Sequence, residues 1–153
     1  QIMLKTIKKI TEQAFKELTT LGGSIFYAFI LLLVLLLGEL ELFIHLLIGL
    51  FFSLLIVVLI RTFYFKNRPK KQRYNNYLER IDASSFPSWH AARAIFLASM
   101  FSYFFINKYM TGALILTALA VSYSRIYLKK HDWVDILGGL VLGMVTFLLV
   151  FLI

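Results

Sequence analysis

Five long apolar runs, separated by short polar segments, occupy most of the sequence after residue 23. They cover residues 24–37, 42–65, 88–106, 110–128 and 133–153. About 20 apolar residues in a helix cross the hydrocarbon core of a bilayer, and a helix satisfies its own backbone hydrogen bonds. With 60% hydrophobic residues and a mean hydropathy of +0.81, the chain lies outside the composition of soluble domains. The sequence therefore predicts an all-α integral membrane bundle of about five transmembrane helices. In the last run, Gly139 and Gly143 have the spacing that lets two helices pack closely.

The segment before the first run has a different pattern. Apolar residues recur at helical spacing, and lysines and glutamates fill much of the rest of the wheel; the apolar positions are Leu4, Ile7, Ile10, Ala14 and Leu18. This pattern predicts an amphipathic helix within residues 1–21 that lies in the membrane interface. A cleavable signal peptide is the alternative, but charges interrupt the apolar core that it requires. The sequence has no internal repeat and no low-complexity linker, so we expect one domain over residues 1–153.

The charge and the cysteine content restrict the possible partners. A net charge of +8 favours contact with anionic lipid headgroups or an anionic substrate. Nucleic acid is not expected as a partner, because the charges lie near the ends of apolar runs and the motifs of nucleic-acid-binding modules are missing. Zero cysteines exclude disulfides, thiolate metal sites and cysteine nucleophiles. The sequence predicts no obligate protein partner.

Three polar islands interrupt the apolar sequence, at residues 61–69, 87–90 and 124–135. If the helices alternate in direction, all three islands reach the same side of the membrane, together with the polar loop at 66–86. Of the 16 lysines and arginines, 15 fall on that side, and only Lys108 falls on the other. The positive-inside rule would make this side cytoplasmic. Many of these residues can be basic because of chemistry at the islands rather than because of topology. The rule therefore does not decide which side of the membrane the islands face.

The arginines of the islands are suited to binding phosphate. Arg61, Arg68 and Arg125 carry fixed positive charges that can hold a phosphate through bidentate hydrogen bonds. Arg61 and Arg68 would share one helix face if the helix persists to residue 67. The alternative role is contact with lipid headgroups, which is common for arginine at helix ends. Ser88 follows a proline and would cap a helix, whose free N–H groups form an anion site.

The histidines of the islands are suited to nucleophilic and proton-transfer chemistry. His131 precedes Asp135 by one helical turn, so the carboxylate can accept from one ring nitrogen and leave the other free. The spacing does not decide whether His90 or His131 attacks. A His and an Asp one turn apart also fit half of a metal site. However, no third ligand stands in a matching place and three arginines would repel a cation, so we expect no metal and no cofactor.

The order and spacing of the islands resemble the three-part signature of the type 2 phosphatidic acid phosphatase (PAP2) superfamily, in its membrane lipid phosphatase branch. The matching positions are Arg61 with Arg68-Pro69, then Pro87-Ser88 with His90, then Ser124-Arg125 with His131 and Asp135. Two residues depart from the signature. Arg61 stands where the family usually has Lys, and Trp89 stands where it usually has Gly. The backbone N–H of that glycine is kept at Trp89, whose indole would either turn outward against lipid or narrow the pocket.

The resemblance also implies a role for each matching residue. It implies that His131 is the nucleophile and forms a phosphohistidine, that Asp135 orients and activates it, and that His90 donates a proton to the leaving oxygen. It also implies that the phosphate is surrounded by Arg61, Arg68, Ser88, Trp89 and Arg125.

We therefore expect a metal-independent membrane enzyme that hydrolyses the terminal phosphate of a lipid phosphate or diphosphate. The substrates that the resemblance allows are phosphatidic acid, phosphatidylglycerol phosphate, lipid A 1-phosphate and undecaprenyl or dolichyl diphosphate. The small number of residues outside the membrane favours a prokaryotic inner membrane. One alternative is a non-enzymatic protein that binds or transports anionic lipid. Another is a family member that has lost catalysis through Trp89.

Overall fold

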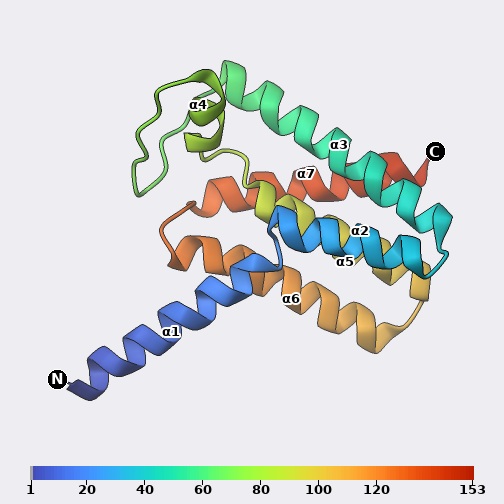
Figure 1. The fold of residues 1–153 in the computed structure, drawn as a ribbon, viewed down its shortest axis with the longest axis horizontal. Helices are drawn as coiled ribbons and strands as arrows, with labels where there is room; N and C mark the ends of the chain where they lie inside the picture. Colours follow the sequence, from blue (N-terminus) through green and yellow to red (C-terminus); the bar gives the residue numbers. More distant parts are fainter. Residues whose placement is uncertain (1) are drawn as a thin grey trace.

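The computed structural model describes residues 2–153, which form seven helices and no β-strand within that range (Figure 1). The helices are α1 (Ile2–Thr20), α2 (Ser24–Leu36), α3 (Leu40–Phe63), α4 (Tyr77–Ala83), α5 (Trp89–Phe105), α6 (Lys108–Tyr127) and α7 (Trp133–Phe151). The all-α prediction is confirmed, and each expected helix lies within a few residues of its predicted position. The helix that the sequence reading missed is α4, which lies inside the polar loop. Its N-cap is Asn76, whose side chain accepts a hydrogen bond from the Glu79 N–H.

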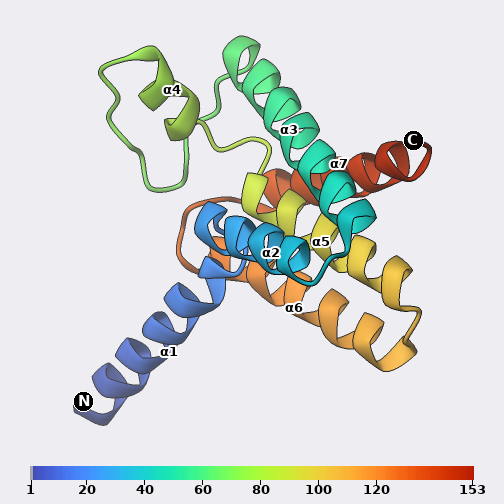
Figure 2. The same ribbon diagram turned by 45° about the vertical axis from the view of Figure 1, so that its right-hand side comes forward.

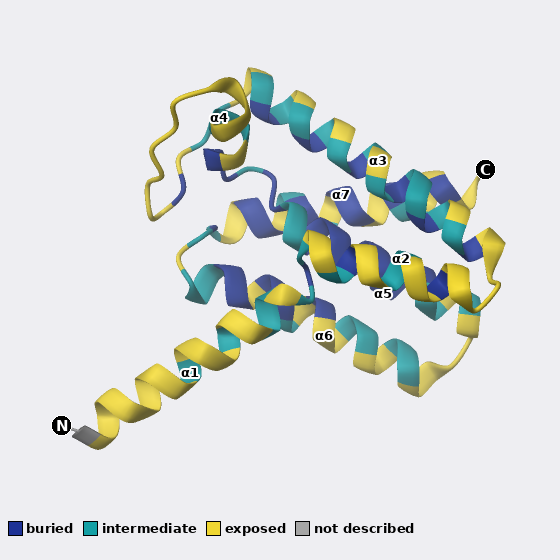
Figure 3. Cartoon of the chain, viewed as in Figure 1, coloured by how far each residue is buried: buried dark blue, intermediate teal, exposed yellow. Residues whose placement is uncertain are grey.

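Helix α5 is the centre of the bundle and packs against α3, α6 and α7 (Figures 1 and 2). Every residue from Ala91 to Met100 is buried. Many of these residues are alanine or serine, which let neighbouring helices approach closely. The surrounding helices are buried on one side and exposed on the other (Figure 3). Many of their exposed residues are large and apolar. This is the pattern of helices that face lipid rather than water.

Length and composition identify fewer spans than the apolar runs predicted. Two helices, α3 and α7, are by themselves long and apolar enough to cross a membrane. The pair α1 and α2, bent by 46°, would make a third span if it crosses as one unit. The other bundle helices lie alongside these but are short or carry charges: α2 has 13 residues, α5 has 17, and α6 has a charged residue near each end.

Helix α7 packs closely against the start of α5 because glycines face it. A Cβ atom added at Gly139 would lie 2.3 Å from the Ser88 carbonyl oxygen, and one added at Gly143 would lie 2.4 Å from the Ala92 carbonyl oxygen. Neither position has room for a side chain, so the two backbones touch. The predicted close packing at these glycines is confirmed, and it fixes the N-terminus of α5 relative to that of α7.

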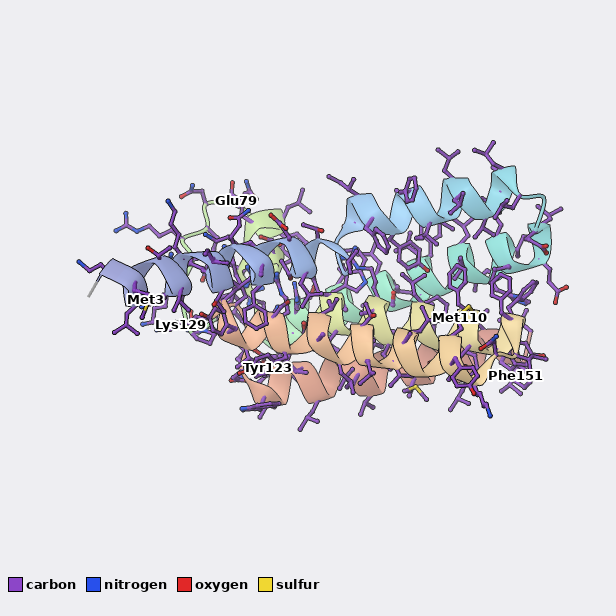
Figure 4. The ribbon with its side chains drawn as sticks, turned by 90° about the horizontal axis from the view of Figure 1, so that it is seen from below. Met3, Glu79, Met110, Tyr123, Lys129 and Phe151 are labelled. Carbon is purple, nitrogen blue, oxygen red and sulfur yellow. The ribbon has the colours of Figure 1, made fainter. Side chains whose placement is uncertain are left out.

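Helix α1 continues past the end of the bundle instead of folding back along it (Figures 1 and 4). Its last turns pack on the end of α6, where the Phe15 ring lies 4.3 Å from the Tyr127 ring, centroid to centroid. The apolar side chains of its first half are exposed: Met3, Leu4, Ile7 and Ile10. Helix α1 is bent by 46° from α2. This is well short of the right angle between a helix in the membrane plane and one that crosses the membrane. The location of α1 in the membrane interface stays a prediction.

The connections between helices divide between two ends of the bundle (Figure 1). The loop with α4, the turn between α6 and α7, and the corner between α1 and α2 lie at one end. The turns after α2 and after α5 lie at the other end, with the C-terminus. Lys129 and Met110 mark these opposite ends of α6 in Figure 4. The three polar islands therefore share one end, as the alternation of helices predicted.

Candidate active site

Backbone hydrogen bonds join the third polar island to the second and to the loop that follows the first. The Ser88 N–H donates to the Asp135 carbonyl at 2.9 Å, which links the start of α5 to the first turn of α7. The Lys70 N–H donates to the Lys129 carbonyl at 3.2 Å, which links the loop after α3 to the turn after α6. Backbone contacts of this kind hold the islands in fixed register, so the side chains between them occupy defined positions.

The first turn of α7 is fixed by a reciprocal cap. The Asp135 N–H donates to Asp132 Oδ1 at 3.0 Å, and the Asp132 N–H donates to Asp135 Oδ2 at 3.1 Å. The sequence signal for this capping box is a pair of acidic residues, three positions apart, at the start of an apolar run. It holds the Asp135 carboxylate, which is completely buried, at the N-terminal end of the helix.

His131 lies against this carboxylate, with Nδ1 at 3.5 Å from Asp135 Oδ2. The predicted pairing one helical turn apart is therefore present, at a distance longer than an ordinary hydrogen bond. The imidazole is 2% exposed. Burial lowers the pKa of His131, with the nearby charges of Arg125 and Arg68, and outweighs the opposing effect of Asp135. The ring is consequently neutral at pH 7, the form in which a histidine nitrogen can attack.

Lys66 is a member of the site that the sequence reading missed. Its ammonium lies 2.8 Å from Asp135 Oδ1 and 2.6 Å from Asp132 Oδ2. Burial opposes the charge, but the two carboxylates outweigh it and raise the pKa of Lys66. The sequence placed Lys66 in a run of basic loop residues, and nothing in the run distinguishes it from its neighbours. The loop fold alone selects it.

The three arginines are buried, and their guanidinium groups are only partly satisfied. Arg61 donates to the carbonyls of Ile81 at 3.1 Å and Pro87 at 2.8 Å, and Arg68 donates to the Asp82 carbonyl. All three arginines are less than 10% exposed, and within residues 2–153 the buried Nε atoms of Arg61, Arg68 and Arg125 have no hydrogen-bond partner. Buried guanidinium donors without protein acceptors can donate hydrogen bonds to an anion.

One prediction about these arginines is wrong in its geometry. Arg61 and Arg68 do not share a helix face, because α3 ends at Phe63 and Tyr64 adopts an extended conformation. The chain then turns back, and Asn67 pairs with Ser84 in an isolated β-bridge. It is this return of the loop that buries Arg68, since the helix that would have aligned it with Arg61 has already ended.

Ser88 caps α5 as predicted, and its side chain accepts from the Ala91 N–H at 3.5 Å. The cap leaves the N–H groups of the first turn, including those of Trp89 and His90, without intrahelical partners. The Ser88 N–H bond to the Asp135 carbonyl places this turn, with His90, beside the first turn of α7, which His131 precedes. The corner between α1 and α2 reaches this turn through Gly22, where an added Cβ would lie 3.1 Å from the His90 carbonyl oxygen.

The Trp89 indole takes neither of the two directions that the sequence reading considered. Its Nε1–H donates to Ser53 Oγ of α3 at 3.3 Å, and the Arg93 guanidinium stacks 4.1 Å above the ring. The ring packs beside Val57 and Leu142. It therefore lies inside the bundle, because Ser53 provides a hydrogen-bond acceptor there. Any contact of Trp89 with phosphate is limited to its backbone N–H.

Arg125 has a partner that was also missed, Thr19 at the end of α1. Arg125 Nη1 donates to Thr19 Oγ1 at 3.0 Å. The two residues are 106 positions apart, so no local pattern could reveal the contact. Helix α1, expected to be a separate surface helix, thus touches one of the phosphate-binding candidates directly.

The ligand set of a metal ion differs from what these residues form. Within residues 2–153, no group of three or more His, Cys, Asp and Glu side chains is arranged to hold a metal ion. Asp135 instead pairs with Lys66 at 2.8 Å. The charges of Arg125 and Arg68 contribute to the lowered pKa of His131. Metal independence of the reaction stays a prediction.

Comparison with known proteins gives the same architecture. A family model described as the PAP2 superfamily matches residues 42–153. The crystal structure of Aquifex aeolicus LpxE is similar with a TM-score of 0.80 and 21% identity, over 94% of this chain and 87% of that chain. A second similar structure is the crystal structure of the first transmembrane PAP2 type phosphatidylglycerolphosphate phosphatase from Bacillus subtilis. Its TM-score is 0.72 and its identity 25%, over 92% of this chain and 74% of that chain. The fold is that of transmembrane proteins.

Proposed function

Because the chain belongs to the PAP2 superfamily, we propose that it is a membrane lipid phosphatase that removes the terminal phosphate of a lipid phosphate or diphosphate through a phosphohistidine. The observation that carries this proposal is the contact between His131 and Asp135, buried beside arginines whose donors lack acceptors. A neutral imidazole next to a carboxylate and a cationic anion site is the arrangement that nucleophilic attack on phosphorus requires.

In the proposed first step, His131 Nε2 attacks the phosphorus atom and the bond from phosphorus to the lipid oxygen breaks. The leaving oxygen takes a proton from His90. Asp135 accepts a hydrogen bond from Nδ1–H and balances the positive charge that forms on the ring. Arg61, Arg68 and Arg125 oppose the charge that builds on the phosphoryl oxygens. Water then attacks the phosphohistidine, gives its proton to His90 and releases inorganic phosphate.

The location of the site supports a lipid as the substrate. The site lies at one end of the bundle, whose helices expose many large apolar residues. A lipid can therefore keep its tail in the bilayer while its phosphate enters between the helices. We consider phosphatidic acid, phosphatidylglycerol phosphate, lipid A 1-phosphate and polyprenyl diphosphates as substrates, and we place the enzyme in a prokaryotic inner membrane.

The test measures phosphate release from a panel of these lipids by the protein purified in neutral detergent. We expect release from at least one lipid and its loss, by at least a thousandfold, in His131→Asn. His45→Asn is the matched control, because His45 lies near the start of α3 at the opposite end of the bundle. Rapid quenching with a radiolabelled substrate should trap an acid-labile phosphoprotein in wild type and none in His131→Asn.

The alternative of a non-enzymatic anionic-lipid-binding or transport protein predicts a different result. Such a protein would release no phosphate from any lipid, and His131→Asn would bind lipid as well as wild type. Undiminished release by His131→Asn would instead refute the phosphohistidine route.

A further inference from the structure

A cavity of about 480 Å³ lies at the entrance to the site, between α1, the loop after α3 and the end of α6. We call it the mouth cavity. Its walls come from three distant segments: Glu12, Lys16 and Thr19 of α1, Lys70, Lys71 and Gln72 of the loop, and Arg125, Leu128 and Lys130 at the end of α6. Its size is in the range of pockets that hold small ligands. Figure 4 shows α1 beside the end of α6 that carries Lys129.

The mouth cavity has an excess of positive charge. Five of its residues are cationic and one, Glu12, is anionic. Glu12 is already paired with Lys16 at 2.8 Å. In the part of the chain that the structure describes, no carboxylate forms an ion pair with Lys70, Lys71 or Lys130. Partial burial, followed by the charges of Arg68 and Arg125, lowers the pKa of Lys130. An anion in the cavity would relieve this repulsion.

The walls of the cavity are held in place by contacts between the three segments that form them. The Lys70 N–H is bonded to the Lys129 carbonyl at 3.2 Å, which brings the loop to the end of α6. The Phe15 ring packs 4.3 Å from the Tyr127 ring, and Arg125 donates to Thr19 at 3.0 Å, which fixes α1 on α6. A cationic cavity that is preorganised in this way binds an anion without first ordering its own walls.

The mouth cavity adjoins the catalytic histidine. The Lys130 and His131 N–H groups both donate to the Arg125 carbonyl, at 3.0 Å and 3.2 Å. Lys130 lines the cavity, whereas the His131 ring is buried beside Asp135. Arg125 belongs to both, since it lines the cavity and lies beside the histidines. A group bound in the cavity would therefore lie next to the phosphate that His131 attacks.

We infer that the mouth cavity binds a second phosphate of the same substrate, so that the enzyme prefers a lipid diphosphate to the corresponding monophosphate. This inference rests on the proposed function. For a diphosphate, His131 Nε2 bonds to the terminal phosphorus, and the bond from that phosphorus to the bridging oxygen breaks. The bridging oxygen takes the proton of His90 and leaves as the lipid monophosphate, whose phosphate occupies the cavity. Water then releases the terminal phosphate from His131.

The test compares farnesyl diphosphate with farnesyl monophosphate, which share one tail, in neutral detergent. We expect wild type to have the higher kcat/KM for the diphosphate. In the double variant Lys70→Gln/Lys130→Gln, the ratio of the two kcat/KM values should fall at least tenfold, because two charge-assisted contacts are lost for one substrate only. Lys108→Gln is the control, since Lys108 begins α6 at the opposite end, and its ratio should equal that of wild type.

A second arm adds phosphatidylglycerol to the micelles, because the phosphate in the cavity could instead belong to a neighbouring lipid. One result overturns the inference: phosphatidylglycerol activates hydrolysis of the monophosphate in wild type but not in the double variant, and the ratio of the two kcat/KM values is the same in both proteins. An unchanged ratio without such activation overturns it as well. Failure of the proposed function gives a distinct result, namely no hydrolysis of either substrate by wild type.

Discussion

Lys66 lies closer to the Asp135 carboxylate than His131 does. The distance from Lys66 Nζ to Asp135 Oδ1 is 2.8 Å, whereas the distance from His131 Nδ1 to Asp135 Oδ2 is 3.5 Å. One buried carboxylate thus serves a cation and an imidazole together. The lysine neutralises part of the charge that would otherwise attract a proton to His131. We therefore expect Lys66 to be a positioning residue whose charge affects the protonation of His131, the proposed nucleophile.

Replacing Lys66 should therefore change the pH dependence of the reaction. Burial keeps the pKa of His131 below its usual value of 6.5, and attack needs the neutral ring, so wild-type kcat should fall only as the pH drops below about 6.5. In Lys66→Met, the uncompensated Asp135 charge raises the pKa of His131, so the acid limb of the profile should move up by about one pH unit.

The matched control for this prediction is Lys66→Arg, which keeps the charge and should restore the wild-type profile. The groups that also face His131 are Arg125, Arg68, Asp135 and His90, and all are retained in both variants. A lower kcat in Lys66→Met with an unmoved acid limb would reduce Lys66 to a structural role.

Thr19 should act on substrate binding through Arg125. In Thr19→Val the hydrogen bond of 3.0 Å to Arg125 Nη1 is lost, and the guanidinium becomes free to leave the orientation in which we propose that it binds phosphate. We expect KM to rise about three- to tenfold with a smaller change in kcat, as for the loss of one hydrogen bond to a charged group. Thr19→Ser keeps the hydroxyl and should behave like wild type. Equal kinetics for both variants would refute the role of Thr19.

Introducing glycine at position 89 should damage the protein rather than improve it. The indole is bonded to Ser53 at 3.3 Å and stacked under Arg93 at 4.1 Å. In Trp89→Gly these contacts and the ring packing are lost, so we expect a loss of about 3 kcal/mol of stability, with no gain in activity. Trp89→Phe keeps most of the packing and should lose less. Thermal unfolding in detergent and phosphate release check both. Activity that appears only in Trp89→Gly would favour an enzyme inactivated by Trp89.

The contact of α7 with α5 should not tolerate a methyl group. In Gly139→Ala the added Cβ would lie 2.3 Å from the Ser88 carbonyl oxygen, so the helices must separate and move His131 away from His90. We expect a loss of at least tenfold in kcat together with a lower unfolding temperature. Gly112→Ala is the control, because a Cβ there meets nothing within 4 Å, and alanine favours a helix by about 1 kcal/mol. Equal behaviour of the two variants would show that the close packing has no effect on catalysis.

Inhibitors should separate a metal-free reaction from a metal-dependent one. Orthovanadate mimics pentavalent phosphorus and should compete with substrate at the arginines and His131. EDTA should leave kcat unchanged, because the proposed steps use only side chains of this protein. Phosphate release is measured before and after dialysis against EDTA. Strong inhibition by EDTA that added divalent metal reverses would overturn the metal-free mechanism.

Local features of the protein followed from the sequence. Apolar runs gave the bundle helices to within a few residues, because a helix in lipid must be apolar over its length. The pairing of His131 with Asp135 followed from a spacing of one helical turn. The cap at Ser88 and the close approach at Gly139 followed from residue type, since each depends on the geometry of one helix terminus or one helix face.

Contacts between distant segments were decided by the tertiary structure alone. Lys66 reaches Asp135 only because the loop turns back after Phe63, and the same turn buries Arg68. Trp89 lies inward because Ser53 of another helix accepts its N–H, and Thr19 holds Arg125 because α1 docks on α6. Sequence spacing carries the periodicity of one helix but not the position of one segment against another. The sequence therefore indicated candidate residues for catalysis and phosphate binding. The packing of the loops and of α1 determined which other residues contact them.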